Sequence, residues 1–433
     1  DTPATINPSD LPPLPNERDE NRLPLVFRLL SKELAAEAFV EMDPEQQELL
    51  IRGFSDTELR EVLDELFVDD AVDIVEEMPA NVVKRILAQA DPDMRKEINE
   101  ILRYPEDSAG AWMTTEYVSL RPNMTVGEAI LRIRRTGVDK ETIYTCYVTQ
   151  DRRLLGMVTV KDLLLCLDDE TPISEIMEEN VISVNTHDDQ EQVAQMFSKY
   201  NFLALPVVDQ EGRMVGIITF DDAMDVMEDE ATEDMEMMAA ILPSDKPYAR
   251  SGVWELVKRR IPWLLLLMLS ATFTGLIITH FESALAACTV LTAFIPMLMG
   301  TGGNSGSQAS VAIIRSLSLG EISFSDLPWI VWKEIRVAVL CGVGLAVCNF
   351  IKMMLVDRLL MGNDEVTAIV ALAVCLTLIF VVLAAKTIGS ILPILAKKIG
   401  LDPAVMASPF ITTIVDALSL LIYFTVASLL LPL

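Results

Sequence analysis

The sequence feature that most constrains this chain is a glycine-rich polar run, Gly300-Thr-Gly-Gly-Asn-Ser-Gly306, set between long apolar segments. Backbone that leaves helical geometry inside a bilayer must be buried in protein or line water, because lipid cannot satisfy its polar groups. The run therefore predicts a broken membrane-spanning helix beside a pathway through the membrane. The alternative is an unbroken helix whose small residues let a second helix pack closely.

The charge of the chain is concentrated in its first half. From Lys258 onward there are 9 of the 64 acidic and 11 of the 34 basic side chains, which leaves 55 acidic and 23 basic side chains before it. A block this acidic excludes nucleic acid as a partner, because nucleic-acid binding requires clustered Lys and Arg. It favours cations, whose ligands are carboxylate oxygens. Charge that serves only solubility is the alternative.

The order of patterns predicts a multidomain protein that begins with an all-α superhelical domain. Residues 1–22 are rich in proline and charge, which predicts a disordered arm. Residues 23–110 alternate short apolar-periodic stretches with breaks at prolines, and proline suits a first helical turn. Such short helices stack into a superhelix around a shared core. Its remaining acids are expected on an exposed, solvated face: Asp69, Asp70, Asp73, Glu76 and Glu77.

Two copies of one α/β unit follow, at residues 111–175 and 176–228. Both end in Gly-x-x-Thr-x-x-Asp, at Gly156–Asp162 and Gly216–Asp222, and both resemble CBS domains. In that family the Thr and Asp often hold a nucleotide ribose. The resemblance therefore implies an ATP site at Thr159, Asp162, Thr219 and Asp222. The alternative is that each Thr caps the helix that follows it.

The last part of the chain is predicted to be a connecting (plug) helix at residues 229–260 and an all-α, five-span membrane domain at residues 261–433. Each of the five apolar segments exceeds the roughly 20 residues that a bilayer requires. If the amino terminus is inside, nine basic residues fall on the cytoplasmic side and two, Lys352 and Arg358, on the other. This asymmetry predicts a cytoplasmic acidic half and a carboxyl terminus that faces outward.

The fifth span carries a single acid, Asp416, on a polar stripe. Ser408, Thr412 and Asp416 lie four residues apart, so they share one helix face. A carboxylate at this depth is costly, at least roughly 2.5–3.5 kcal/mol on insertion scales, and faces a bundle interior or water. The stripe predicts a pore-facing ion ligand. A protonated Asp that bonds to a neighbouring helix is the alternative.

The pore residues favour a hydrated divalent cation. Magnesium dehydrates reluctantly and keeps several waters in an octahedral shell. In a two-fold homodimer, two Asp416 carboxylates would face each other across the axis, with Asn304 and nearby carbonyls as further acceptors. Potassium selection would require rings of close carbonyls, and an anion pore would require Arg or Lys.

The whole chain resembles the MgtE family of bacterial magnesium channels. The resemblance is carried by six stretches: Tyr104–Gly110, Glu230–Asp234, Phe281–Ser283, Pro296–Gln308, Leu401–Ala404 and Asp416. It implies that Asp416 recognises the ion in the pore, together with Gly302, Gly303, Asn304 and Thr412. It places Glu282 at the outer mouth, and Asp402 at the inner mouth, where Asp402 would share Mg²⁺ with acids of the connecting helix. The gating acids that it implies are Asp73, Asp222, Glu230, Glu233, Asp234, Asp245, Glu255 and Asp402.

These expectations combine into a homodimeric, multi-pass Mg²⁺ uptake channel of the bacterial inner membrane, embedded in lipid and closed by cytoplasmic Mg²⁺. Two alternatives remain: a carrier that exchanges Mg²⁺ for Na⁺ or H⁺, and a broader divalent transporter that also accepts Mn²⁺ or Co²⁺. An enzyme is not expected, because the chain has only two His and no nucleophile–base pair.

Overall fold

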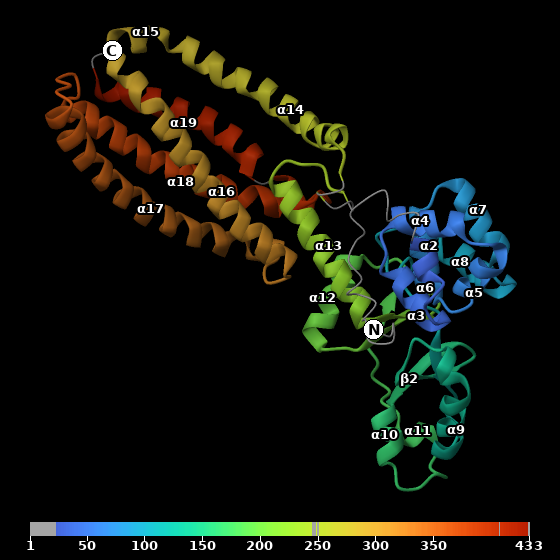
Figure 1. The fold of residues 1–433 in the computed structure, drawn as a ribbon. Helices are drawn as coiled ribbons and strands as arrows, with labels where there is room; N and C mark the ends of the chain where they lie inside the picture. Colours follow the sequence, from blue (N-terminus) through green and yellow to red (C-terminus); the bar gives the residue numbers. More distant parts are fainter. Residues whose placement is uncertain (1–22, 245–247, 249–250, 407, 432–433) are drawn as a thin grey trace. The chain divides into compact units, whose positions relative to one another are not determined.

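The computed structural model describes residues 23–244, 248, 251–406 and 408–431 (Figure 1). The chain divides into two compact units, Asp1–Met227 and Glu228–Leu433. The arm expected at residues 1–22 and the gating acid expected at Asp245 lie outside the described residues.

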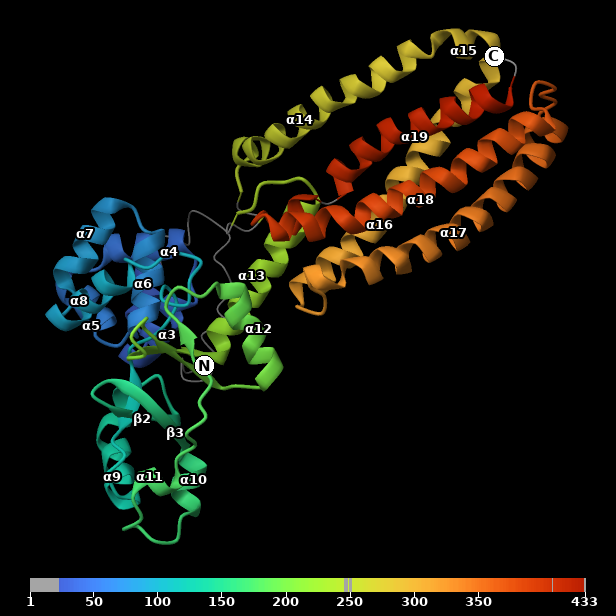
Figure 2. The ribbon, with the colours of Figure 1, turned by 180° about the vertical axis from the view of Figure 1, so that it is seen from behind.

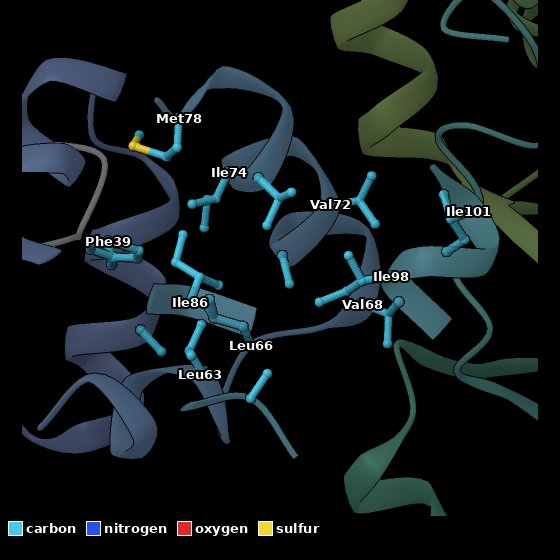
Figure 3. Close-up of a cluster of buried hydrophobic side chains, with 14 of the residues drawn as sticks. Phe39, Leu63, Leu66, Val68, Val72, Ile74, Met78, Ile86, Ile98 and Ile101 are labelled. Atoms are coloured by element: carbon cyan, nitrogen blue, oxygen red, sulfur yellow. The ribbon is translucent and has the colours of Figure 1, made fainter. Parts of the chain in front are cut away.

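The first unit opens with seven short helices that share one apolar core. Proline begins two of them, α4 and α8, as the breaks predicted, and Ser55 forms a capping box with Glu58 at the start of α5. The core contains Phe39, Leu63, Val72 and Ile98, which are almost fully buried (Figure 3). The helices are α2 (Leu23–Phe27), α3 (Lys32–Val40), α4 (Pro44–Gly53), α5 (Asp56–Leu63), α6 (Val68–Glu77), α7 (Ala80–Gln89) and α8 (Pro92–Ile101).

The two α/β repeats have the same sheet topology, which confirms the internal duplication. In each repeat a first strand pairs in parallel with a second, and the second pairs antiparallel with a third. The first repeat contains β1 (Tyr117–Leu120), α9 (Val126–Thr136), η3 (Gly137–Asp139), β2 (Thr142–Gln150), β3 (Arg153–Thr159) and α10 (Val160–Leu165). The second contains α11 (Ile173–Ile176), β4 (Val184–Asn185), α12 (Gln190–Tyr200), β5 (Ala204–Val208) and β6 (Met214–Thr219).

A long helix, α13 (Phe220–Met238), leaves the second repeat, and the next long helix among the described residues starts at Val253. The second unit then contains α14 (Val253–His280), α15 (Glu282–Ala287), η4 (Thr289–Phe294), α16 (Ile295–Ser318), η5 (Phe324–Asp326), α17 (Leu327–Lys352), η6 (Met353–Leu360), α18 (Ala368–Lys398), η7 (Pro403–Met406) and α19 (Ser408–Leu430). Among the residues that the structure describes, four segments are long and apolar enough to cross a membrane: α14, Phe324–Leu360, α18 and Pro403–Leu430.

The remaining expected span, the second in chain order, corresponds to α16, which carries the glycine run and is therefore less apolar. It lies beside α18 and α19 in both views of the chain (Figures 1 and 2). Near its end, Leu317 accepts a hydrogen bond from Lys397 Nζ at 3.0 Å, at the end of α18. Since α16 runs beside the spanning helix α18 to that end, we count it as a membrane helix in addition to the four segments.

The expected break at the glycines is wrong. α16 runs unbroken from Ile295 to Ser318, through all four glycines of the run. The physical reason is close packing: the missing side chains make room for α18 and α19, so the backbone keeps its own helical hydrogen bonds. The structure thus has the alternative arrangement, an unbroken helix whose small residues let α18 and α19 pack closely.

Candidate ion pathway and cation-sensing acids

The glycine face of α16 is in direct contact with its neighbours. A Cβ added to Gly302 would lie 2.7 Å from Val381 Cγ1 on α18 and 2.8 Å from Ser419 Oγ on α19. One added to Gly303 would lie 2.8 Å from Thr412 Cγ2. The structure therefore brings Gly302, Gly303 and Thr412 together, as expected for the pore residues, but through helix packing rather than through a turn of the chain.

Polar groups gather around this contact. Asn304 follows Gly303 and is exposed, whereas Asp416, one helical turn from Thr412 on α19, is half-buried. Ser419 Oγ is buried and has no hydrogen-bond partner in the part of the chain that the structure describes. These residues supply an amide, a carboxyl and hydroxyls on two packed membrane helices, and hard cations prefer oxygen atoms of these kinds.

The acidic end of α13 lies against the inner ends of the membrane helices. Met237 and Met238 pack on Ile314 of α16 and Ala404 of η7. Burial raises the pKa of Asp234, the nearby Asp402 raises it further, and a hydrogen bond from Ser318 opposes both. The two acids therefore share a site whose charge repulsion a bound cation would relieve.

The remaining acids expected at the two mouths, the gating acids at the inner mouth and Glu282 at the outer mouth, have different positions. Asp402 Oδ1 accepts the backbone N–H of Ala404 at 2.7 Å, so it caps the turn that follows, which is the alternative role for this residue. Glu255 Oε2 accepts the N–H of Gly252 at 3.4 Å, at the start of α14. Glu230 and Glu233 lie on α13, and Glu282 is exposed in the first turn of α15.

Arg259 joins the connecting segment to the first membrane helix. It is buried near the start of α14, pairs with Glu236 of α13, and donates from Nε to the carbonyl of Leu242 at 2.7 Å. Arg259 therefore connects α13 to α14 through one side chain. The sequence showed Arg259 only as part of a basic cluster.

A second group of acids lies within the first unit, where three segments meet. They are Asp69, Asp70 and Asp73 on α6, Glu116 and Glu141 beside the strands of the first repeat, and Asp221 and Asp222 at the start of α13. We call these seven residues the cytoplasmic acid cluster. Glu116 Oε2 accepts the backbone N–H of Val68 at 3.1 Å, which ties the first repeat to the start of α6.

Desolvation and mutual repulsion raise the pKa values of most acids in this cluster. Burial, together with repulsion from Asp222 and Asp70, raises the pKa of Glu141 to about 8. The same causes raise the pKa of Asp73 to about 7 and that of Asp70 to about 6. The pKa of Asp222 is also raised, chiefly by burial. Carboxylates so crowded favour bound cations or protons.

Asp69 corrects one expectation from the sequence. It was expected on a solvated face, but only 9% of it is exposed, and its Oδ1 has no hydrogen-bond partner among the described residues. Burial first, and then repulsion by Asp70, raise its pKa well above the usual range. The helix buries this acid because α6 packs against the α/β repeats, which a helical periodicity alone does not reveal.

A polar cavity of about 310 Å³ opens beside the cluster. Its lining is mostly acidic and includes Asp64, Asp91, Asp93, Glu97, Glu116 and Asp139, with one lysine, Lys140. Across residues 23–244, 251–406 and 408–431, however, no group of three or more His, Cys, Asp or Glu side chains is arranged to hold a metal ion. The acids are thus near one another without forming a coordination shell.

The Thr and Asp residues that were expected to bind a nucleotide form hydrogen bonds with each other in each repeat. Thr159 caps α10 in a capping box with Asp162, and the two side chains are joined at 2.5 Å. Thr219 Oγ1 donates to Asp222 Oδ2 at 2.5 Å. Both pairs fit the helix-cap alternative, and Asp222 also belongs to the cytoplasmic acid cluster.

Comparisons with known proteins cover almost the whole chain. Residues 6–107 match the MgtE intracellular N domain, residues 109–169 and 173–229 match CBS domains, and residues 295–426 match a divalent cation transporter model described as MgtE. The chain is 38% identical to the magnesium transporter MgtE of Thermus thermophilus, over 98% of this chain and 93% of that protein. The chain belongs to the MgtE family of magnesium transporters.

A second curated relative agrees with this assignment. The chain is 32% identical to the magnesium transporter MgtE of Bacillus subtilis, over 98% of this chain and 92% of that protein. The solved cytosolic domain of the Mg²⁺ channel MgtE in complex with ATP is 41% identical, with a TM-score of 0.49 over 52% of this chain and 91% of that one. The family confirms a magnesium transporter with an intracellular N domain, rather than an enzyme.

Proposed function

We propose that the chain is a Mg²⁺ channel closed by cytoplasmic Mg²⁺. The observation that carries this proposal is the crowding of the cytoplasmic acid cluster, in which the helical domain, the first repeat and α13 each contribute acids. Cations would bridge these acids and favour the compact arrangement that gathers them. When Mg²⁺ falls, repulsion would loosen that arrangement, which is a shift of population between two states.

The conducting site is proposed at Asp416, with Thr412, Asn304 and the backbone of Gly302 and Gly303. An exposed Asn304 on a membrane helix is unfavourable against lipid, as is Gln308, one turn further along the same face. A second copy related by a two-fold axis would cover this face and place two Asp416 carboxylates at the axis. Mg²⁺ would pass there with part of its water shell retained.

Closure at the inner mouth is proposed to use Asp234 and Asp402, with Glu230, Glu233, Asp245 and Glu255 as further acids of the connecting segment. Asp73 and Asp222 would act in the cytoplasmic acid cluster, and Glu282 at the outer mouth. The repulsion from Asp402 that helps to raise the pKa of Asp234 supports a cation between these two acids. Through its ion pair with Glu236, Arg259 would couple a change in the position of α13 to the first membrane span.

We also propose that the protein lies in the bacterial inner membrane with its carboxyl terminus outside the cell. ATP is proposed at the CBS repeats through Thr159, Asp162, Thr219 and Asp222. Each Thr–Asp pair would have to exchange its internal hydrogen bond for the ribose, so ATP and the helix cap compete for the same groups.

The test is Mg²⁺ flux into proteoliposomes containing the full chain. Asp416→Asn should abolish or strongly reduce the flux while the protein remains folded, and Glu321→Gln, an exposed acid of the loop after α16, is the matched control. Wild-type flux in Asp416→Asn would remove Asp416 from the pore. Flux that saturates and requires a Na⁺ or H⁺ gradient would favour the carrier, and equal flux of Mn²⁺ or Co²⁺ the broader transporter.

A further inference from the structure

The first turns of α17 present two tryptophans and two cations on one exposed face. Trp329, Trp332, Lys333 and Arg336 are spaced i, i+3, i+4 and i+7, so they lie on the same side of the helix. The tryptophans are 57% and 59% exposed. On the opposite side Ile330 is buried against the bundle, so the exposed face does not take part in the fold of this chain. We call these four residues the α17 interfacial patch.

Each cation of the patch forms a cation–π contact with an indole ring, and its positive charge is not neutralised by an ion pair with any residue that the structure describes. Lys333 Nζ lies 5.0 Å from the ring centroid of Trp329, and Arg336 Cζ lies 5.8 Å from that of Trp332. Neither cation forms an ion pair with a carboxylate of the described chain. The nearby Asp326 accepts hydrogen bonds from Ser323, so its carboxylate is already engaged. The patch therefore retains two positive charges.

The position of the patch is the border between hydrocarbon and water. α17 belongs to a spanning segment, and the exposed face continues beyond Arg336 with Leu340, Val343 and Val347, all apolar. Along the axis the patch covers about 10 Å, so it spans the roughly 5–7 Å of headgroup region on one side of a bilayer and reaches the edge of the hydrocarbon. Because the chain enters α14 from the cytoplasm and α17 is the third membrane helix, this end of α17 is cytoplasmic.

We propose that the α17 interfacial patch binds the phosphate headgroup of an anionic phospholipid from the cytoplasmic leaflet. The charges select an anion, and the indoles favour the membrane interface, where their apolar rings meet lipid and their N–H groups meet water. The apolar continuation of the face supplies the surface for the acyl chains. This inference rests on family membership and on the spans, not on the proposed gating.

The experiment uses the purified full chain in detergent, titrated with phosphatidylglycerol or phosphatidylcholine, with bound lipid counted by native mass spectrometry. Wild-type protein should retain phosphatidylglycerol in preference to phosphatidylcholine. Lys333→Gln with Arg336→Gln should weaken phosphatidylglycerol binding about 30-fold, and each single change about 5-fold. Lys199→Gln is the control, because Lys199 forms a similar pair with Tyr200, at 5.1 Å, in the second CBS repeat. It should leave lipid binding unchanged.

Trp329→Leu with Trp332→Leu tests the aromatic part and should lower retention of phosphatidylglycerol without removing a charge. Equal binding of both lipids by the wild type, or unchanged binding by the double Gln variant, would overturn the proposal. So would competition by glycerol phosphate at the concentration of the lipid, which would identify a soluble anion as the ligand. A change from dimer to monomer in the double Gln variant would instead make this face an interface between copies.

Discussion

The contact between Gly306 and Gly389 allows a sharp test of how the membrane helices pack. A Cβ added to Gly389 of α18 would lie 3.0 Å from the carbonyl carbon and 3.2 Å from the Cα of Gly306 on α16, and closer still to the carbonyl oxygen. Ordinary van der Waals contact begins at 3.4 Å. Because these atoms are backbone, no change of rotamer can relieve the clash, and the two helices must separate.

Gly389→Ala is therefore expected to destabilise the membrane unit. Overpacking of a well-packed core costs about 1–3 kcal/mol, and a clash against backbone belongs at the upper end of that range. Gly344→Ala on α17 is the matched control, since its Cβ would meet nothing within 4 Å. That change replaces glycine in an open part of a helix and should be neutral or stabilising by up to about 1 kcal/mol.

The assay is thermal unfolding of the detergent-purified full chain, together with Mg²⁺ flux in proteoliposomes. Gly389→Ala should melt well below the wild type and lose flux, because the displaced α16 carries Asn304 and the glycines that contact Thr412. Gly344→Ala should retain both properties. If the two variants melt at the same temperature as the wild type, the close approach of α16 and α18 is not what holds this pair of helices together.

Three further predictions concern the cytoplasmic side. Glu141 has its pKa raised to about 8 in the folded state, so the folded state binds more protons than the unfolded state between about pH 4 and 8. Without Mg²⁺, denaturant titrations should therefore show the free energy of unfolding decreasing as pH rises through this window. Glu141→Gln should make this decrease smaller and should also reduce the stabilisation of the folded state by Mg²⁺. Asp402→Ala should raise the Mg²⁺ concentration that closes the channel; superimposed inhibition curves, with a uniform stability loss of about 0.5–2 kcal/mol, would identify a helix cap only. Arg259→Gln should weaken Mg²⁺-dependent closure by separating Glu236 from α14, at a cost of about 1.5–3 kcal/mol for a charged hydrogen bond. The exposed neighbour Arg260→Gln should leave inhibition curves unchanged, and equal effects of both changes would argue against this coupling.

Local chemistry made much of the fold predictable from the sequence. Pro44 and Pro92 begin helices because proline has no N–H to lose in a first turn. The repeated Gly-x-x-Thr-x-x-Asp ends each repeat at a strand-to-helix junction, where Thr159 caps the next helix. Long apolar segments identify membrane helices because a bilayer sets their length. Each of these signals involves residues close together in the chain.

The sequence by itself determined the order of domains, the membrane helices and the lone acid of the last span. Only the tertiary structure decided that α16 stays helical through its glycines, because that depends on how closely α18 and α19 approach. It also decided that Asp69 is buried, and that Glu116 and Glu141 join Asp70 in one cluster. None of these acids has a local signature, since their pKa values are raised by burial and by charges distant in sequence, and such long-range terms are absent from any short stretch of residues.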